Sequence, residues 1–222
     1  KSTLISRGVN PKKLHVVINS ANTSIFSGLE YDENLATNLN LKNKFVVGYI
    51  GTHGLAHDLL NAVRAAAILK DHDIHFLFVG EGAEKSSIIS FAKELNATNI
   101  HFVGMQPRER IPSYLGLCNL GLVHLKNDPV FKTVIPSKIF ETMSSGRPII
   151  YCGPESDGSR LILKYSCGVV TSPNNPDLLA KKIMELKDNP DLCNLLASNG
   201  MKASQMYSRE NQAKNTMNVI NR

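Results

Sequence analysis

Tryptophan is absent from this 222-residue sequence, aromatic residues make up only 6% of it, and long apolar runs are missing. A helix that crosses a bilayer needs about 20 consecutive apolar residues, whereas runs such as residues 76–79 are far shorter. No secretory signal is visible. With 42% hydrophobic and 20% charged residues, the composition also excludes a disordered chain and predicts a folded core.

Cysteine is sparse: the four present are Cys118, Cys152, Cys167 and Cys193, and no two form a CxxC pair. This spacing argues against a disulfide framework and against a zinc site. A reducing compartment is the natural setting, so we expect a cytoplasmic protein, with association with the cytoplasmic face of a membrane left open.

Several catalytic patterns are also missing. The sequence has no GxSxG motif, no recognisable Ser/His/Asp arrangement and no carboxylate cluster suited to a divalent metal. Hydrolysis by a triad is therefore excluded, and no metal site is expected.

The net charge is +6, with an isoelectric point of about 9.1, which favours an anionic partner. The 25 basic residues are scattered rather than concentrated. Nucleic-acid binding usually requires a basic patch with interleaved aromatic residues, so we expect no nucleic-acid partner. A phosphorylated small molecule, an acidic membrane surface and a merely solvated basic surface all remain open.

Short β-rich runs alternate with amphipathic stretches along most of the chain. Strands are predicted at residues 44–50, 74–79, 100–103, 120–125, 148–152 and 168–171, and helices at 56–70, 83–95, 109–117, 136–145, 159–165, 176–187, 191–198 and 208–220. Continuous apolar strands separated by helices predict an α/β fold with a doubly wound parallel sheet. Six strands are too few for an eight-unit barrel.

The first 43 residues differ from the rest. A short strand is predicted at residues 14–18, and the remainder is rich in Asn and Ser with weak periodicity. We therefore divide the chain into a connector or edge segment at 1–43, a main domain at 44–207 and a terminal helix at 208–222.

In doubly wound sheets, ligands bind beyond the carboxyl ends of the strands. The first predicted strand ends in the sequence Gly51-Thr52-His53-Gly54, where two glycines permit close backbone approach to a phosphate. An ordinary turn is the alternative. His53 and His57 are four residues apart, which suits contact with a phosphate or a substrate, a metal, or a solvated helix start.

The next two loops carry further candidates. Glu81, between Gly80 and Gly82, is suited to bond a sugar hydroxyl or a base edge, or it is simply an exposed acid in a tight turn. Met105 follows the third strand, where either a ring stacks on it or nothing does.

Residues 131–141 (FKTVIPSKIFE) are the most informative stretch. A proline sets the geometry of a helix start whose free amides point outward, and Lys132 and Lys138 add positive charge there. This arrangement suits a diphosphate. Ser137 and Glu141 are four residues apart and share a helix face. Because helical side chains lean toward the N-terminus, Glu141 is aimed at the ribose of such a ligand, unless it is only a solvated glutamate.

The sequence Pro136-Ser137-Lys138-Ile139-Phe140-Glu141, continuing through residues 142–149, resembles glycosyltransferase family 4, also called group 1. Weaker resemblances follow in the right order, at residues 19–26, 48–57, 79–85, 102–104, 111–112 and 208–210. Together they cover nearly the whole chain and match the C-terminal, donor-binding half of the GT-B fold. The pattern is most similar to the subgroup that makes surface polysaccharides, often with amino- or deoxy-sugars.

The resemblance implies a role for each matching residue. Glu141 corresponds to the glutamate that holds the nucleotide ribose, and Ser137 and Lys138 to the helix start that receives the diphosphate. Glu81, Gly82 and Met105 would line the base and ribose, and Thr52, His53 and Gly54 would border the phosphates.

Two departures from the family pattern stand out. Thr133 occupies the position of the family's first glutamate, which contacts the donor sugar. The Arg and Lys that many members place on the diphosphate are replaced near Thr52 and His57. A donor sugar that lacks hydroxyl groups would not need the missing carboxylate.

The resemblance implies a retaining glycosyltransferase of the hexosyl or N-acetylhexosaminyl type that transfers from a nucleotide-sugar, most simply a UDP-sugar, to a glycan or lipid-linked acceptor. The catalytic residues are not identified, because they would be shared with a missing N-terminal domain, and the isolated chain is expected to be inactive. No cofactor and no metal are expected, and peripheral contact with the inner membrane surface is left open. The alternatives are a nucleotide-sugar epimerase of the same fold and a non-catalytic nucleotide-binding module.

Overall fold

The computed structural model describes residues 1–221. Its centre is a six-stranded parallel sheet in the order β3-β2-β1-β4-β5-β6. The strands are β1 (Phe45–Ile50), β2 (Ile74–Val79), β3 (Ile100–Val103), β4 (Leu120–His124), β5 (Ile149–Cys152) and β6 (Gly168–Thr171). The predicted doubly wound α/β fold is therefore confirmed. Because the strand order reverses between β1 and β4, the carboxyl ends of these two strands are where such folds place the ligand crevice.

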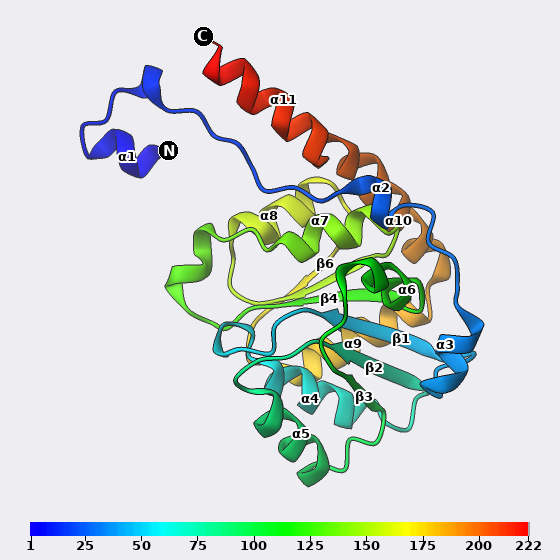
Figure 1. The fold of residues 1–222 in the computed structure, drawn as a ribbon. Helices are drawn as coiled ribbons and strands as arrows, with labels where there is room; N and C mark the ends of the chain where they lie inside the picture. Colours follow the sequence, from blue (N-terminus) through cyan, green and yellow to red (C-terminus); the bar gives the residue numbers. More distant parts are fainter. Residues whose placement is uncertain (222) are drawn as a thin grey trace.

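Helices cover both faces of the sheet (Figure 1). The helices of the main body are α4 (Leu59–Ile68), α5 (Lys85–Glu94), α6 (Ile111–Gly116), α7 (Ser137–Ser144), α8 (Asp157–Lys164), α9 (Pro176–Lys187) and α10 (Pro190–Ser204). Helices α4, α5 and α9 pack on one face around an apolar cluster that includes Phe76 and Ile183. On the other face, α7 and α8 bury a second cluster around Phe140 and Tyr151. The helix after β1 and the helix after β4 thus lie on opposite faces.

Several helix boundaries differ from the prediction for local reasons. The predicted helix at 56–70 is interrupted, because Asp58 takes a left-handed conformation (φ 43°) between the 3-10 turn η2 (Leu55–His57) and α4. Helix α8 begins earlier than predicted, where Ser156 and Ser159 form a reciprocal capping box. Helix α10 runs well past the predicted end at residue 198.

The predicted strand at residues 14–18 is wrong. This stretch has no strand partner, and Val16 and Val17 are 64% and 43% exposed. An isolated extended segment gains no ladder hydrogen bonds, so β propensity alone does not make it a strand. The first 43 residues instead hold α1 (Ser2–Ser6), η1 (Pro11–Lys13), α2 (Thr23–Phe26) and α3 (Glu33–Asn38). The proposed boundaries at residues 43 and 207 stay predictions.

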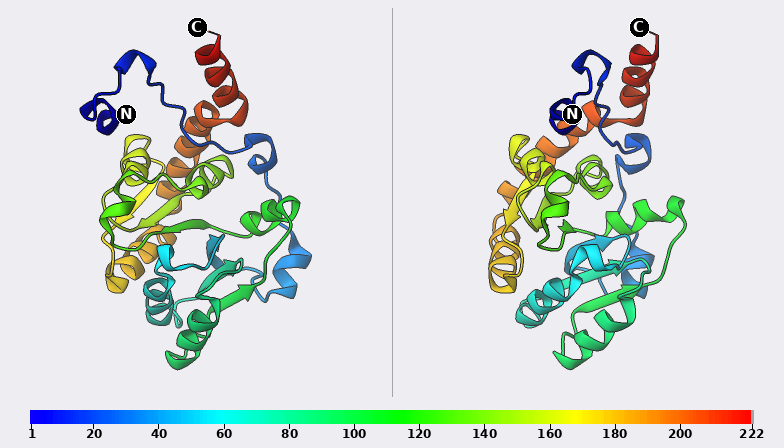
Figure 2. Two further views of the ribbon diagram at one scale, coloured as in Figure 1. Left: turned by 60° about the vertical axis from the view of Figure 1, so that its left-hand side comes forward. Right: turned by 90° about the vertical axis from the view of Figure 1, so that its left-hand side faces the viewer.

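The two ends of the chain meet at one side of the body. Ala21 pairs with Ser208 in an isolated bridge, and the Arg209 amide donates to the Ala21 carbonyl at 3.0 Å. Beyond this point, the first twenty residues and α11 (Arg209–Ile220) extend away from the sheet on the same side (Figure 2). Helix α11 buries none of its side chains.

Candidate functional site

The loops that follow β1 and β2 are locked together by their backbones. The Gly51 amide donates to the Val79 carbonyl at 2.8 Å, and the His53 amide donates to the Glu81 carbonyl at 2.9 Å. A Cβ atom on Gly80 would collide with the Gly51 carbonyl, and Gly80 has a φ of 143°. Glycine is required at position 80 for both reasons, and the two loops form one rigid floor.

Lys138 connects this floor to α7. Its Nζ lies 4.9 Å from the centre of the Tyr49 ring, which is a cation–π geometry. Its side chain passes so close over Gly51 that a Cβ there would meet both Cε and Nζ. The Tyr49 hydroxyl in turn donates to the Thr52 carbonyl at 2.7 Å. The ammonium group is therefore held over the carboxyl end of β1, at the point where the strand order reverses.

The first turn of α7 contributes free amides beside this ammonium. Pro136 precedes the helix, and no side chain caps its N-terminus. The first amides of a helix have no partner within the helix, so those of Ser137 and Lys138 are available to an anion. Ser137 is exposed, and burial lowers the pKa of Lys138 while Glu141 opposes that shift.

Glu141 lies one turn further along α7 and is partly buried. Burial raises the pKa of its carboxyl group, and the charges of Lys138, Arg108 and Arg209 oppose this shift. Arg108 belongs to the 3-10 turn η3 (Arg108–Arg110), and Arg209 begins α11. The carboxylate thus has three cations around it, contributed by separate parts of the chain.

A depression of about 190 Å³ lies over the carboxyl ends of β1 and β2, lined by backbone and side chains that include Gly51, Glu81 and Met105. Met105 is 74% exposed, as a stacking platform would require. The Lys85 ammonium donates to the Glu81 carboxylate at 2.6 Å and to the Gly80 carbonyl at 3.0 Å. This Lys85 bond, and to a lesser degree the Met105 amide, lower the pKa of Glu81.

Gly82 belongs to the same floor, because a Cβ on it would collide with the His53 backbone. Thr52 is exposed and Gly54 is half-buried at the edge of this loop. The structure therefore brings together most of the residues singled out in the three loops, together with the start of α7.

His53 lies beneath the floor rather than on it. The residue is fully buried between the rings of Tyr49 and Phe78, and neither ring nitrogen has a hydrogen-bond partner among the described residues. Burial, followed by the charge of Lys85, lowers the pKa of His53 to about 4. In this conformation the neutral ring supports the loop from below and does not face the crevice.

His57 and His124 form a second buried polar group at the start of α4. The His57 Nδ1 lies 3.3 Å from the His124 carbonyl. The Asn61 amide donates to His124 Nε2 at 2.9 Å, which leaves the proton of a neutral His124 on Nδ1. Burial lowers the pKa of His57, with a further contribution from Lys138, and burial lowers that of His124 to about 4.

Lys132 and Thr133 are placed apart from this cluster. Both are exposed on the 3-10 turn η4 (Pro129–Thr133), whose first turn is capped by the Asp128 carboxylate. The turn lies in the connection between β4 and α7, on the carboxyl side of the sheet (Figure 1). Sequence reasoning missed Tyr49, Arg108 and Arg209, because their relation to the site depends on tertiary packing. It also missed Lys85, although the four-residue spacing from Glu81 is a signal that could have found it.

The family model for glycosyl transferases group 1 matches residues 30–203, so the chain belongs to this family. Curated relatives include the putative teichuronic acid biosynthesis glycosyltransferase TuaH of Bacillus subtilis, 28% identical over 63% of this chain and 34% of its own length. The probable glycosyltransferase WbjE of Pseudomonas aeruginosa is 28% identical over 65% of this chain and 36% of its own length. The chain spans about a third of the length of these two relatives. The predicted resemblance to group 1 is confirmed.

Solved structures show the same fold. Anabaena HepE in complex with UDP and glucose aligns with a TM-score of 0.82 at 18% identity, over 99% of this chain and 60% of HepE. The C-terminal domain of a group 1 glycosyl transferase (LpcC) from Francisella tularensis aligns over 86% of this chain and all of that domain, with a TM-score of 0.67 and 19% identity. The chain therefore has the fold of the C-terminal half of a GT-B protein.

The buried histidines predict a specific loss of stability in acid. The pKa of His53 is lower in the folded protein than its ordinary value of 6.5, so its contribution is complete above pH 6.5 and is lost as the pH falls toward 4. Replacing His53 with Leu removes this titration. We expect unfolding free energies measured at pH 8 and pH 5 to fall by roughly 1–2 kcal/mol less in the variant than in the parent.

The exposed His72 supplies the matched control, because His72→Leu leaves the buried ring in place. Denaturant titrations of the three proteins at both pH values make the comparison. Parallel pH profiles for the parent and His53→Leu would show that the ring is not held neutral by burial.

Proposed function

We propose that this chain is the donor-binding half of a retaining glycosyltransferase and that it holds a UDP-sugar in the crevice between β1 and β4. The observation that best supports this proposal is made at the start of α7. Two free amides, the Lys138 ammonium and the Glu141 carboxylate lie close together there. A nucleoside diphosphate offers complementary groups, because its negatively charged diphosphate is attached directly to the ribose that carries the two hydroxyl groups. HepE, which shares this fold, was crystallised with UDP and glucose, which supports this choice of ligand.

In this proposal, the start of α7 stabilises the negative charge that develops on the diphosphate when the sugar leaves. The amides of Ser137 and Lys138 and the Lys138 ammonium are fixed before the reaction, which is the condition for effective electrostatic stabilisation. Lys138 is anchored on Tyr49, and the nearby His57 holds its loop against β4 by donating from Nδ1 to the His124 carbonyl. Thr52 and Gly54 border the phosphates, and His53 holds the loop from beneath.

The remaining contacts follow the geometry of the depression. Glu141 would accept hydrogen bonds from the ribose hydroxyls, with Arg108 and Arg209 keeping its carboxylate charged. The base would lie over Met105, Glu81 and Gly82. Lys132 and Thr133 would face the sugar, and the lack of a carboxylate at Thr133 favours a sugar with fewer hydroxyl groups.

The other half of the enzyme would be an N-terminal domain that supplies the acceptor site and shares the catalytic groups. The chain covers 60% of HepE and smaller fractions of the curated relatives, which supports a larger protein. The acceptor would be a glycan or a lipid-linked glycan, the transferred group a hexosyl or N-acetylhexosaminyl unit, and the isolated chain inactive. A cytoplasmic location and contact with the inner membrane surface are part of the same proposal. None of the helices in residues 1–221 is long and apolar enough to cross a membrane.

Two other functions use the same pocket. A nucleotide-sugar epimerase would bind the same donor but would need no acceptor, and a binding module would neither transfer nor epimerise. With the complete protein, acceptor-dependent release of UDP supports the transferase. Release of UDP or epimerisation of the donor without acceptor would favour the epimerase.

The first test concerns the phosphates. Because the α7 amides and Lys138 supply positive charge themselves, UDP should bind this chain with the same affinity in EDTA and in magnesium. Calorimetric titration with UDP under both conditions measures this. A strict requirement for magnesium would contradict metal-free binding, and no binding in either condition would contradict the site.

The second test concerns the ribose. Glu141→Gln keeps the side-chain size but removes the charge and turns one acceptor into a donor. Calorimetry should show UDP affinity weakened by about 1–3 kcal/mol, roughly 5- to 150-fold, at an unchanged melting temperature. Thr133→Ala, on the exposed η4 turn, is the control and should leave UDP affinity nearly unchanged. Wild-type affinity in Glu141→Gln, or loss of its fold, would show that Glu141 is only a structural residue.

A further inference from the structure

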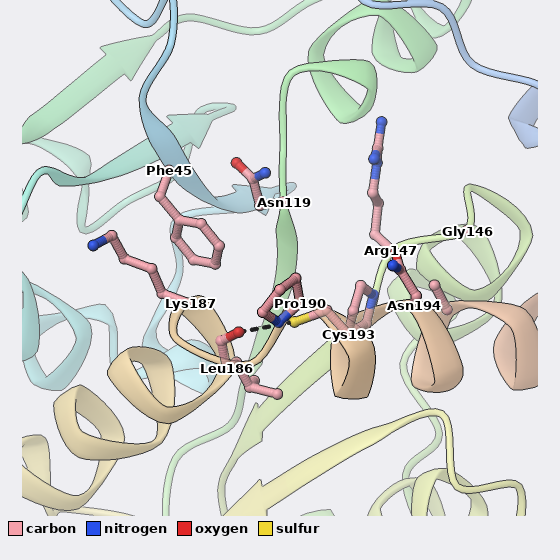
Figure 3. A pocket seen from close by; sticks show the side chains of 11 residues that line it. Phe45, Asn119, Gly146, Arg147, Leu186, Lys187, Pro190, Cys193 and Asn194 are labelled. Carbon is pink, nitrogen blue, oxygen red and sulfur yellow. Dashed lines mark hydrogen bonds between the residues drawn. The ribbon is translucent and has the colours of Figure 1, made fainter.

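Two cavities lie at the amino ends of the strands, on the side of the sheet opposite the candidate nucleotide site. The first has a volume of about 300 Å³ and lies between the start of β1, the residues before β4 and β5, and the helices α9 and α10 (Figure 3). The second, of about 320 Å³, lies between the start of β1 and the end of α6. Asn119 and Arg147 line both of them, so the two cavities adjoin.

The lining of this double cavity is one-sided in charge. It includes the cations Lys44, Arg147 and Lys187 and no aspartate or glutamate. Asp73 lies outside the lining; its Oδ1 accepts from the Lys44 ammonium at 2.6 Å, and Lys187 also helps to lower its pKa. Lys44 is thereby paired, whereas no ion pair within residues 1–221 involves Arg147 or Lys187.

Arg147 is the one of the three cations with a buried donor that lacks a partner among the described residues. One guanidinium nitrogen, Nη2, donates to the Gly116 carbonyl at 3.0 Å. The Nε atom is buried and has no hydrogen-bond partner among the described residues. Within residues 1–221, no carboxylate lies in ion-pair contact with this guanidinium, although the residue is largely removed from solvent. Desolvating even part of a cation without a counter-ion has a cost, so this half-buried guanidinium is suited to take an anion.

Asn119 adds neutral donors to the same wall. Its Oδ1 accepts from the Val46 amide at 2.8 Å, which fixes the side-chain orientation. The hydrogen bonds found across residues 1–221 leave the Asn119 Nδ2 group free to donate. Asn194 of α10 lines the first cavity across from it (Figure 3). Amide and guanidinium donors with no competing carboxylate are the groups that bind phosphate oxygens.

We propose that this double cavity at the amino ends of the strands is a second anion site. It binds a small phosphorylated molecule and is separate from the nucleotide site at the carboxyl ends. The strands are at most six residues long, so the site at their amino ends and the site at their carboxyl ends are about 20 Å apart. The Arg147–Gly116 bond shows that Arg147 also caps the end of α6, a structural role that the test must separate from binding.

Inorganic pyrophosphate is the probe, titrated into isotope-labelled protein while amide resonances are followed by NMR. The proposal predicts saturable shifts of the Asn119 and Asn194 side-chain amides and of the Gly146 backbone amide, in addition to any shifts around Gly51 and Ser137. The two sites are followed by different amide resonances. The test of this double cavity can therefore be interpreted even if the proposed nucleotide site proves wrong. Resonance shifts confined to the residues around Gly51 and Ser137, at the carboxyl ends of the strands, would overturn the proposal.

A matched pair of variants on α9 then tests the electrostatics. Lys187→Gln removes a lining charge, whereas Lys181→Gln removes an exposed charge from the same helix. Lys187→Gln should weaken pyrophosphate binding in the double cavity about tenfold, and Lys181→Gln should weaken it by less than about twofold. Equal effects of the two substitutions would reduce the site to general surface charge and contradict the proposal.

Arg147→Lys completes the set, because it keeps the charge but loses the planar donor fork. It should weaken the same binding while the melting temperature reports any loss at the end of α6. If Arg147→Lys unfolds, the Lys187 comparison still decides. Unchanged affinity in a folded Arg147→Lys would show that Arg147 is only a helix cap.

Discussion

The candidate site depends on one contact, the passage of the Lys138 side chain over Gly51 onto the ring of Tyr49. It joins the loop after β1 to the helix after β4, which are separated by most of a domain in sequence. Any side chain at position 51 would displace the lysine, and the φ of 141° at Gly51 is itself unfavourable for other residues. The ammonium is thereby held at the point where the strand order reverses.

The surrounding structure maintains this contact. The Tyr49 ring is fully buried and packs on Phe78 and the two loop histidines, so it cannot move away from the lysine. The backbones of the β1 and β2 loops are hydrogen-bonded to each other, which holds Gly51 in place. Burial favours the neutral form of Lys138, and the carboxylate of Glu141 offsets this by favouring the charged form. The same pair then presents a cation and an anion on one helix face.

Much of this arrangement could be predicted from the sequence. Alternating apolar runs and helical patterns predicted the parallel sheet and all six of its strands, because the inner strands are almost entirely buried and the edge strands β3 and β6 are still largely apolar. The placement of the α7 residues was also predictable, since a proline start, and Lys138 and Glu141 three residues apart, put them on one face at the helix start.

What the sequence did not reveal depends on packing. Tyr49 looked like an ordinary strand residue, and its place under Lys138 follows only from the crossing of β1 and α7. His53 was expected beside the phosphates, yet the tight turn directs it beneath the loop into an apolar environment. The segment at 14–18 has strand-forming residues but no neighbouring strand to pair with. The charges of Arg108 and Arg209 act on Glu141 from distant elements that no local pattern connects.

Comparing UDP with uridine in a Lys138→Met variant tests the central contact most directly. Methionine keeps much of the length and apolar stem of lysine but removes the charge. Calorimetry should show UDP affinity reduced about 10- to 100-fold, because a charge-assisted phosphate contact is lost, while uridine affinity changes less than about twofold. The melting temperature confirms that the variant is folded. Equal losses for UDP and uridine, or no loss for either, would contradict the placement of the diphosphate at Lys138.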